Sequence, residues 1–131
     1  MATILVVDDD DTVRNALSEL FAEEHTCHAA ATAEEALTYL SSQQYDVVVT
    51  DYHMRGLTGL DVLIKVKESQ QQTPVILISG SSSRERAEDL RRMGAFEYLA
   101  KPFRLQDIEM SVTRAITYHE ELMQKHKEAS R

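Results

Sequence analysis

Three short apolar runs rich in β-branched residues constrain the fold more than any other feature of this sequence. They occupy residues 4–7, 47–49 and 75–78, and a polar side chain follows each of them within two residues. Runs of this length without polar alternation are typical of strands buried on both faces, as in parallel sheets. Two weaker strands are predicted at residues 26–29 and 97–99.

Helical patterns lie between these strands. Residues 12–24 place five apolar side chains on one stripe, and Asp11 is expected to cap that helix. Capping boxes at Thr32/Glu35 and Ser82/Glu85 predict two more helices, the second ending at Gly94. In a helix over residues 59–68 the spacing predicts one face made of Leu60, Leu63, Ile64 and Lys67.

A fifth helix is predicted from about residue 104, so strand and helix alternate five times. Short crossovers between parallel strands are right-handed, and they lead to a doubly wound α/β sheet with helices on both faces. The 131 residues fit one compact domain of this kind.

Polar side chains follow the strands at the points where they end. In a doubly wound sheet, ligands bind beyond the carboxyl ends of the strands. The sequence therefore predicts that five side chains meet at one edge. They are Asp8, Asp9, Asp51, Ser79 and Lys101.

Three carboxylates in one crevice repel one another, and a divalent cation relieves that repulsion. Hard oxygen ligands select Mg²⁺, Mn²⁺ or Ca²⁺ rather than Zn²⁺. Carboxylates, a hydroxyl and an ammonium around one point suit phosphoryl transfer, in which a carboxylate itself can be the nucleophile. No Gly-rich nucleotide motif is present, so ATP bound at this site is not the expected phosphoryl donor.

The ordered set of motifs resembles the receiver domain of two-component response regulators, of the chemotaxis-regulator type. The resemblance spans roughly residues 3–117, and residues 5–9, 48–54, 78–80 and 101–103 together with Gly59 carry it. It implies a flavodoxin-like, five-stranded parallel sheet of strand order 2-1-3-4-5. It also implies a regulatory domain that catalyses only its own phosphorylation and dephosphorylation.

The resemblance implies a role for each site residue. Asp51 is the expected phosphoacceptor. Mg²⁺ or Mn²⁺ is expected on the side chains of Asp9 and Asp51 and on the backbone carbonyl of His53, with Asp8 acting through water. Lys101 would pair with the phosphoryl oxygens, and the peptide bond before Pro102 is expected to be cis. Ser79 and Tyr98 would form a coupled switch.

Partners follow from the same resemblance and from charge. The expected donor is a histidine kinase or phosphotransfer protein, and the expected target is an output domain or protein that the sequence does not identify. The net charge of −8 argues against direct nucleic-acid binding, and no run of about 18 apolar residues predicts a membrane span. A cytoplasmic location is expected. Residues 1–117 are predicted to be the receiver, and residues 118–131 a helical extension or linker that could support a homodimer.

Two other functions remain open at this point. A haloacid-dehalogenase-like phosphatase would use Asp8 as nucleophile and Asp10 as acid, with Ser79 and Lys101 in its later motifs. That assignment leaves Asp51 without a role. The second alternative is a receiver-fold interaction module that is never phosphorylated.

Overall fold

The computed structural model describes residues 1–70, 72–80 and 84–129. Strands and helices alternate along these residues, as predicted. The strands are β1 (Thr3–Val7), β2 (Thr26–Ala30), β3 (Val47–Asp51), β4 (Val75–Ser79) and β5 (Glu97–Ala100). The helices are α1 (Asp11–Ala22), α2 (Ala33–Ser42), α3 (Gly59–Ser69), α4 (Arg84–Arg92) and α5 (Leu105–Ala129).

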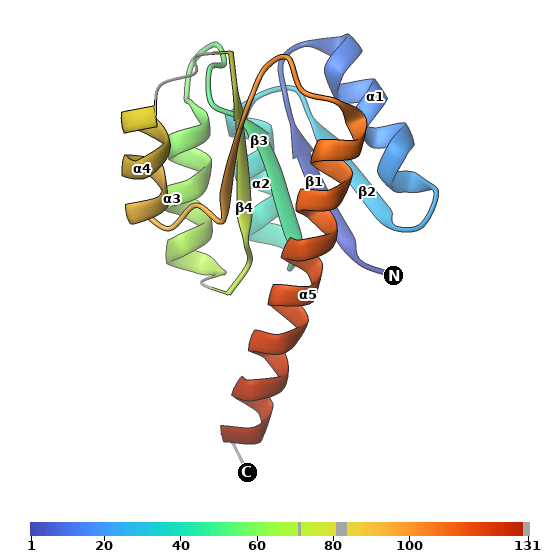
Figure 1. The fold of residues 1–131 in the computed structure, drawn as a ribbon, viewed down its shortest axis with the longest axis vertical. Helices are drawn as coiled ribbons and strands as arrows, with labels where there is room; N and C mark the ends of the chain where they lie inside the picture. Colours follow the sequence, from blue (N-terminus) through green and yellow to red (C-terminus); the bar gives the residue numbers. More distant parts are fainter. Residues whose placement is uncertain (71, 81–83, 130–131) are drawn as a thin grey trace.

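The five strands form one parallel sheet of order β2-β1-β3-β4-β5 (Figure 1). The predicted fold class and strand order are therefore confirmed. The register places Val7 beside Thr50 and Asp51 beside Ile78, so neighbouring strands end at nearly the same level. This alignment brings the side chains that follow β1, β3, β4 and β5 to a common edge.

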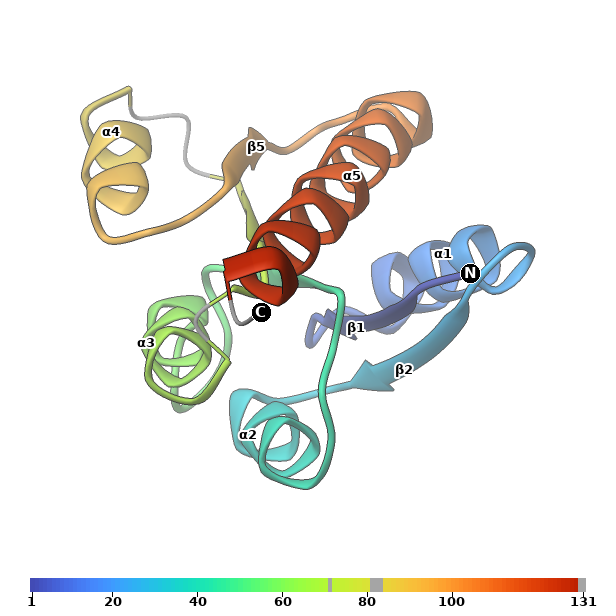
Figure 2. The same cartoon turned by 90° about the horizontal axis from the view of Figure 1, so that it is seen from below.

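Side chains of alternate residues fill two apolar layers, one on each face of the sheet. Ile4, Val6 and Val49 face α1 and α5, whereas Leu5, Val7 and other strand residues of the second layer face α2, α3 and α4. Figure 2 shows the same division, with α1 and α5 on one side of the strands and α2 and α3 on the other. Both faces are covered, which explains the continuous apolar runs in the sequence.

The cap of α1 differs from the prediction. Asp10, not Asp11, is the N-cap, and its Oδ1 accepts hydrogen bonds from the backbone N–H groups of Thr12 and Val13. Asp11 is the first helical residue, and its carboxylate pairs with Arg14. The extended backbone at Asp10 lets its side chain fold back over the helix terminus.

The buried face of α3 also differs in part from the prediction. Val62, Leu63 and Val66 are buried, whereas Ile64 is 42% exposed. A capping box that the sequence analysis did not identify starts the helix, because the Thr58 hydroxyl and the side chain of its N3 residue each accept from the backbone of the other. The helix therefore begins at Gly59, directly after its N-cap.

Helix α4 ends as predicted near Gly94, whose φ is +107°. The Gly94 N–H donates to Arg91 O, and the Ala95 N–H donates to Leu90 O. These two hydrogen bonds form a Schellman motif, which requires a left-handed residue at this position. The capping box predicted from Ser82 and Glu85 lies outside the residues whose side chains the structure describes.

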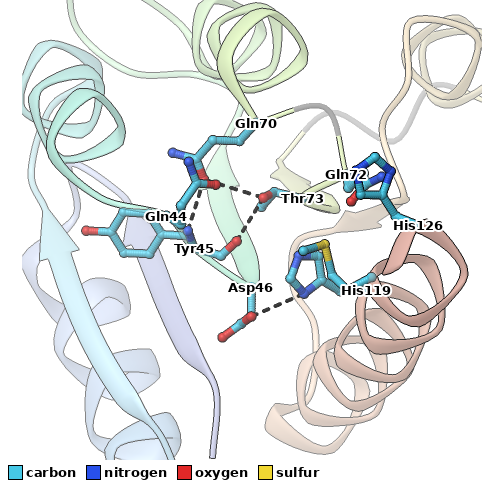
Figure 3. A pocket seen from close by; sticks show the side chains of 9 residues that line it. Gln44, Tyr45, Asp46, Gln70, Gln72, Thr73, His119 and His126 are labelled. Atoms are coloured by element: carbon cyan, nitrogen blue, oxygen red, sulfur yellow. Dashed lines mark hydrogen bonds and ion pairs between the residues drawn. The ribbon is translucent and has the colours of Figure 1, made fainter. Parts of the chain in front are cut away.

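Helix α5 continues without interruption past the end of the sheet (Figure 1). Its extension is fastened where it leaves the body, because His119 Nδ1 lies 3.1 Å from Asp46 Oδ1. The other oxygen of Asp46 accepts from the Thr3 N–H at 2.7 Å. Figure 3 shows this contact in a hollow at the amino edge of the sheet, where Gln70 and Thr73 also bind the backbone of Tyr45. Among the described residues, none of the helices combines the length and apolar character needed to cross a bilayer.

Candidate functional site

Three carboxylates meet at the carboxyl edge of the sheet. Asp8 directly follows β1, Asp51 is the last residue of β3, and ligand oxygens of Asp8, Asp9 and Asp51 all lie within 4.8 Å of one another. Asp8 is 1% exposed and Asp51 is 5% exposed, whereas Asp9 is open to solvent. The Asp8 N–H still pairs with Ala30 O of β2, so the sheet itself fixes the position of this carboxylate.

One cation faces the buried carboxylates. Lys101 Nζ lies 3.4 Å from Asp51 Oδ2 and 3.5 Å from Asp8 Oδ2. The Lys101 residue follows β5, and its N–H donates to Ser79 O at 2.7 Å. The peptide bond between Lys101 and Pro102 is cis, as expected. Residues more than 40 positions apart in the chain therefore surround one point.

The electrostatics of the site reflect its burial. Loss of solvent raises the pKa of Asp51, and the charge of Asp8 raises it further, while Lys101 partly opposes both effects. Burial likewise raises the pKa of Asp8. For Lys101, burial alone would lower the pKa, but the charges of Asp51 and Asp8 outweigh it and raise the pKa. One ammonium does not neutralise three carboxylates, so the site favours an additional cation.

Two arginines hold the acidic loops, and the sequence analysis did not identify either of them. Arg14 Nη1 donates to the backbone carbonyl of Asp8 at 2.9 Å. The backbone N–H of Arg55, in the loop after β3, lies 3.3 Å from Asp9 Oδ2. The Arg55 contact has no sequence signal, because a backbone N–H makes it and its position depends on how the loop folds back. The Arg14 contact is made by the guanidinium, but its target is a backbone carbonyl that the sequence does not identify.

The remaining predicted residues lie on β4, on β5 and in the loop after β3. Ser79 is buried at the end of β4, beside Asp51's strand, and Tyr98 is half-buried in β5. His53 is exposed, and its backbone N–H lowers the pKa of Asp51 by hydrogen bonding. Gly59 lies against the same segment, since a Cβ at this position would be 2.4 Å from Asp51 O. Tyr98 lies within β5, beside Leu77, whereas the other predicted site residues lie on strand ends or loops at this edge.

A carboxyl-edge cluster of three acids and a lysine on a doubly wound sheet is the arrangement that the resemblance to receiver domains implied. The model of the response regulator receiver domain matches residues 4–113. The chain therefore belongs to this family and is the receiver domain of a two-component response regulator. It is a regulatory domain rather than a conventional enzyme.

Relatives of established identity support this assignment. The DNA-binding transcriptional regulator NtrC of Proteus hauseri is 35% identical over 92% of this chain and 26% of its own length. The regulatory protein AtoC of Escherichia coli is 37% identical over 86% of this chain and 25% of its own length. The chain thus spans about a quarter of the length of these two relatives.

Solved structures agree. A response regulator receiver domain from Clostridium thermocellum has a TM-score of 0.86 at 31% identity, over 93% of this chain and 99% of its own. The response regulator TrrA of Thermotoga maritima, solved in complex with Mg²⁺-BeF, has a TM-score of 0.77 at 33% identity, over 88% of this chain and 99% of its own.

The phosphatase alternative is not favoured. Its acid would be Asp10, but Asp10 caps α1 and its own N–H donates to Asp8 Oδ1 at 2.9 Å. Its nucleophile would be Asp8, which is as buried as Asp51 but lies at a position that the receiver family explains. The unphosphorylated module is also not favoured, because the acidic cluster and its lysine are complete.

Proposed function

We propose that Asp51 accepts a phosphoryl group and that Asp8, Asp9, Ser79 and Lys101 support the transfer. The observation that carries this proposal is the position of Asp51, a buried carboxylate between two further acids and an ammonium. A carboxylate in this setting can act as a nucleophile toward phosphorus.

The donor set fits Mg²⁺ or Mn²⁺, because it consists of hard carboxylate oxygens on one rim. Asp9 and Asp51 would hold the ion by their side chains, His53 by its backbone carbonyl and Asp8 through water. When bound, the ion supplies charge neutralisation for the phosphoryl oxygens.

The chain's own groups carry the transfer. An oxygen of Asp51 forms the new O–P bond while the P–N bond of a phosphohistidine breaks, and the electron pair returns to the imidazole nitrogen. Lys101 is already within 3.4 Å of Asp51 and stabilises the charge on the transferred oxygens. The Ser79 hydroxyl donates a hydrogen bond to the same group.

The phosphoryl group then biases a conformational equilibrium. Ser79 moves toward the new oxygens, and Tyr98 on β5 moves inward with it. Only contacts that differ between the two states can shift the equilibrium, and the Ser79 and Lys101 contacts to phosphate are of that kind. The surface around α4, β5 and α5 changes as a result and alters the binding of a downstream partner.

A histidine kinase or phosphotransfer protein is the proposed donor. Residues 1–117 are proposed as the receiver, and residues 118–131 as a helical extension or linker toward an output domain. The short share of NtrC and AtoC that this chain covers supports an output region elsewhere in the protein. We also propose that two receivers pair through this extension. The proposed location of the protein is the cytoplasm.

The test is phosphorylation by a small-molecule phosphoryl donor with Mg²⁺, followed by intact-mass analysis. The wild type should gain one phosphoryl group, and Asp51→Asn should gain almost none. Asp46→Asn is the matched control, because Asp46 lies at the opposite edge of the sheet beside His119, and it should behave as the wild type does. Equal incorporation into Asp51→Asn, or mapping of the phosphate to Asp8, would overturn the proposal.

A further inference from the structure

A second polar cavity lies at the amino edge of the sheet, away from the acidic cluster. Its volume is about 350 Å³, and its walls come from the ends of α3 and α4, the loop before β4, the segment before β5 and α5. Two of its lining residues are cationic, Lys67 and Arg91. None of the described residues that line it is acidic, although the chain carries a net charge of −8.

The Lys67 side chain is held in this cavity by the shape of the α4 terminus. A Cβ on Gly94 would lie 2.6 Å from Lys67 Cε and 3.4 Å from its Nζ. The stem of the lysine therefore passes directly over the glycine, and any larger residue would displace it. Burial lowers the pKa of Lys67, with no anionic group acting in the opposite direction.

Neither cation has a carboxylate partner among the described residues. Asp89, on the same helix as Arg91, pairs with Arg92 instead, at 3.3 Å. Lys67 is half-buried without a carboxylate partner, which is costly, and an anion held between Lys67 and the exposed Arg91 would relieve that cost.

The cavity also has an apolar wall. The rings of Phe96 and Tyr118 lie with their centroids 5.2 Å apart and form one side of it. The volume falls at the lower end of the range for small-molecule sites, and the combination of an apolar wall with a few polar groups is typical of them.

We propose that this cavity binds a small phosphate-bearing molecule, with its oxyanion held by Lys67 and Arg91 and its organic part against Phe96 and Tyr118. Charge-assisted hydrogen bonds from an ammonium and a guanidinium are the strongest available to a phosphate. The site is independent of Asp51, which lies at the other edge of the sheet.

The test uses inorganic pyrophosphate with EDTA, followed by amide NMR. The signals of Gly94 and Ala95 should shift and saturate with a Kd of about 0.1 to 1 mM. Lys67→Met and Arg91→Gln should each weaken binding by at least about fivefold, because each removes one charge-assisted contact. Arg92→Gln is the matched control and should change the Kd by less than about twofold, since Arg92 does not line the cavity.

A second measurement needs no variant. The Lys67 Cε signal should titrate below the ordinary lysine value of 10.5 without pyrophosphate, and above its ligand-free value once pyrophosphate is bound. Asp51→Asn should bind pyrophosphate as the wild type does, which separates this site from the proposed phosphoacceptor. The proposal would be overturned by the absence of a saturable shift at about 10 mM, or by Lys67→Met and Arg91→Gln both binding pyrophosphate as tightly as the wild type does.

Discussion

Asp51 is the proposed nucleophile, and its buried negative charge also lowers the stability of the fold. Burial and the charge of Asp8 raise its pKa, so the folded protein holds a proton on this carboxyl more tightly than the unfolded chain does. Native stability therefore falls as the pH rises from the unfolded value of 3.8 through the raised folded value. Above the folded pKa of Asp51, this loss of native stability no longer changes with pH.

Asp51→Asn should consequently be more stable than the wild type at pH 7 in EDTA, because asparagine carries no charge to bury. The advantage should shrink as the pH falls and vanish near pH 3, where the wild-type carboxyl is protonated in both states. Urea unfolding at several pH values measures this. Addition of Mg²⁺ should restore stability to the wild type more than to the variant. A less stable Asp51→Asn at pH 7 would contradict the prediction.

Gly59 lies against the backbone of Asp51, the proposed phosphoacceptor. Because an added Cβ would lie 2.4 Å from Asp51 O, Gly59→Ala should force the chain after β3 to shift and cost about 1–3 kcal/mol. It should also slow phosphoryl incorporation. Gly80→Ala is the matched control, since a Cβ there meets nothing within 4 Å, and its stability should change by less than about 0.5 kcal/mol. Chemical denaturation of both variants would show whether the close approach matters.

At the scale of elements, two adjacent acids at the N-terminus of α1 make different contacts and should contribute differently to stability. Asp10→Ala removes both side-chain hydrogen bonds to the first turn and should cost about 1 kcal/mol. Asp11→Ala removes only an exposed ion pair with Arg14 and should cost about half of that or less. Thermal unfolding of the two variants compares them directly. Equal losses would contradict the assignment of Asp10 as the cap.

The strands and the clustering of the three acids with Lys101 could be predicted because their signals are local and redundant. Each buried run ends at a polar side chain, and parallel strands bring these ends together. The cap of α1 could not be predicted, because Asp10 and Asp11 are chemically equivalent until the backbone angles are known. The buried stripe of α3 was predicted only in part, because apolar residues surround much of this helix. Ile64 thus fits the spacing as well as Val62 does, and only packing against the sheet decides between them.

At the scale of the whole molecule, the α5 extension should not be needed for folding, but its removal should lower the free energy of unfolding. Truncation after Thr117 removes the Asp46–His119 contact and leaves a charged carboxylate with only the Thr3 N–H. We expect a loss of about 1–2 kcal/mol, as for a hydrogen bond to a charged group. His119→Ala in the full chain should reproduce most of it.

Phosphoryl incorporation should persist in the truncated chain, because the acidic cluster lies at the other edge of the sheet. Intact-mass analysis and thermal unfolding provide the two readouts. A truncated chain as stable as the full one, or one that no longer accepts phosphate, would show that the extension has a different role.

Helix α5 is continuous across the point where His119 contacts Asp46, so it can pivot there as one rigid rod. An α-helix is stiff and rises about 1.5 Å per residue, so the stretch from residue 118 to 129 reaches about 18 Å past the body. A tilt of the helix by about 10° about His119 would displace its far tip by about 3 Å. About 21 Å of the helix lies between residue 105 and His119, so a movement beside Lys101, where the helix starts, would be transmitted along the rigid helix to its far tip at a comparable size.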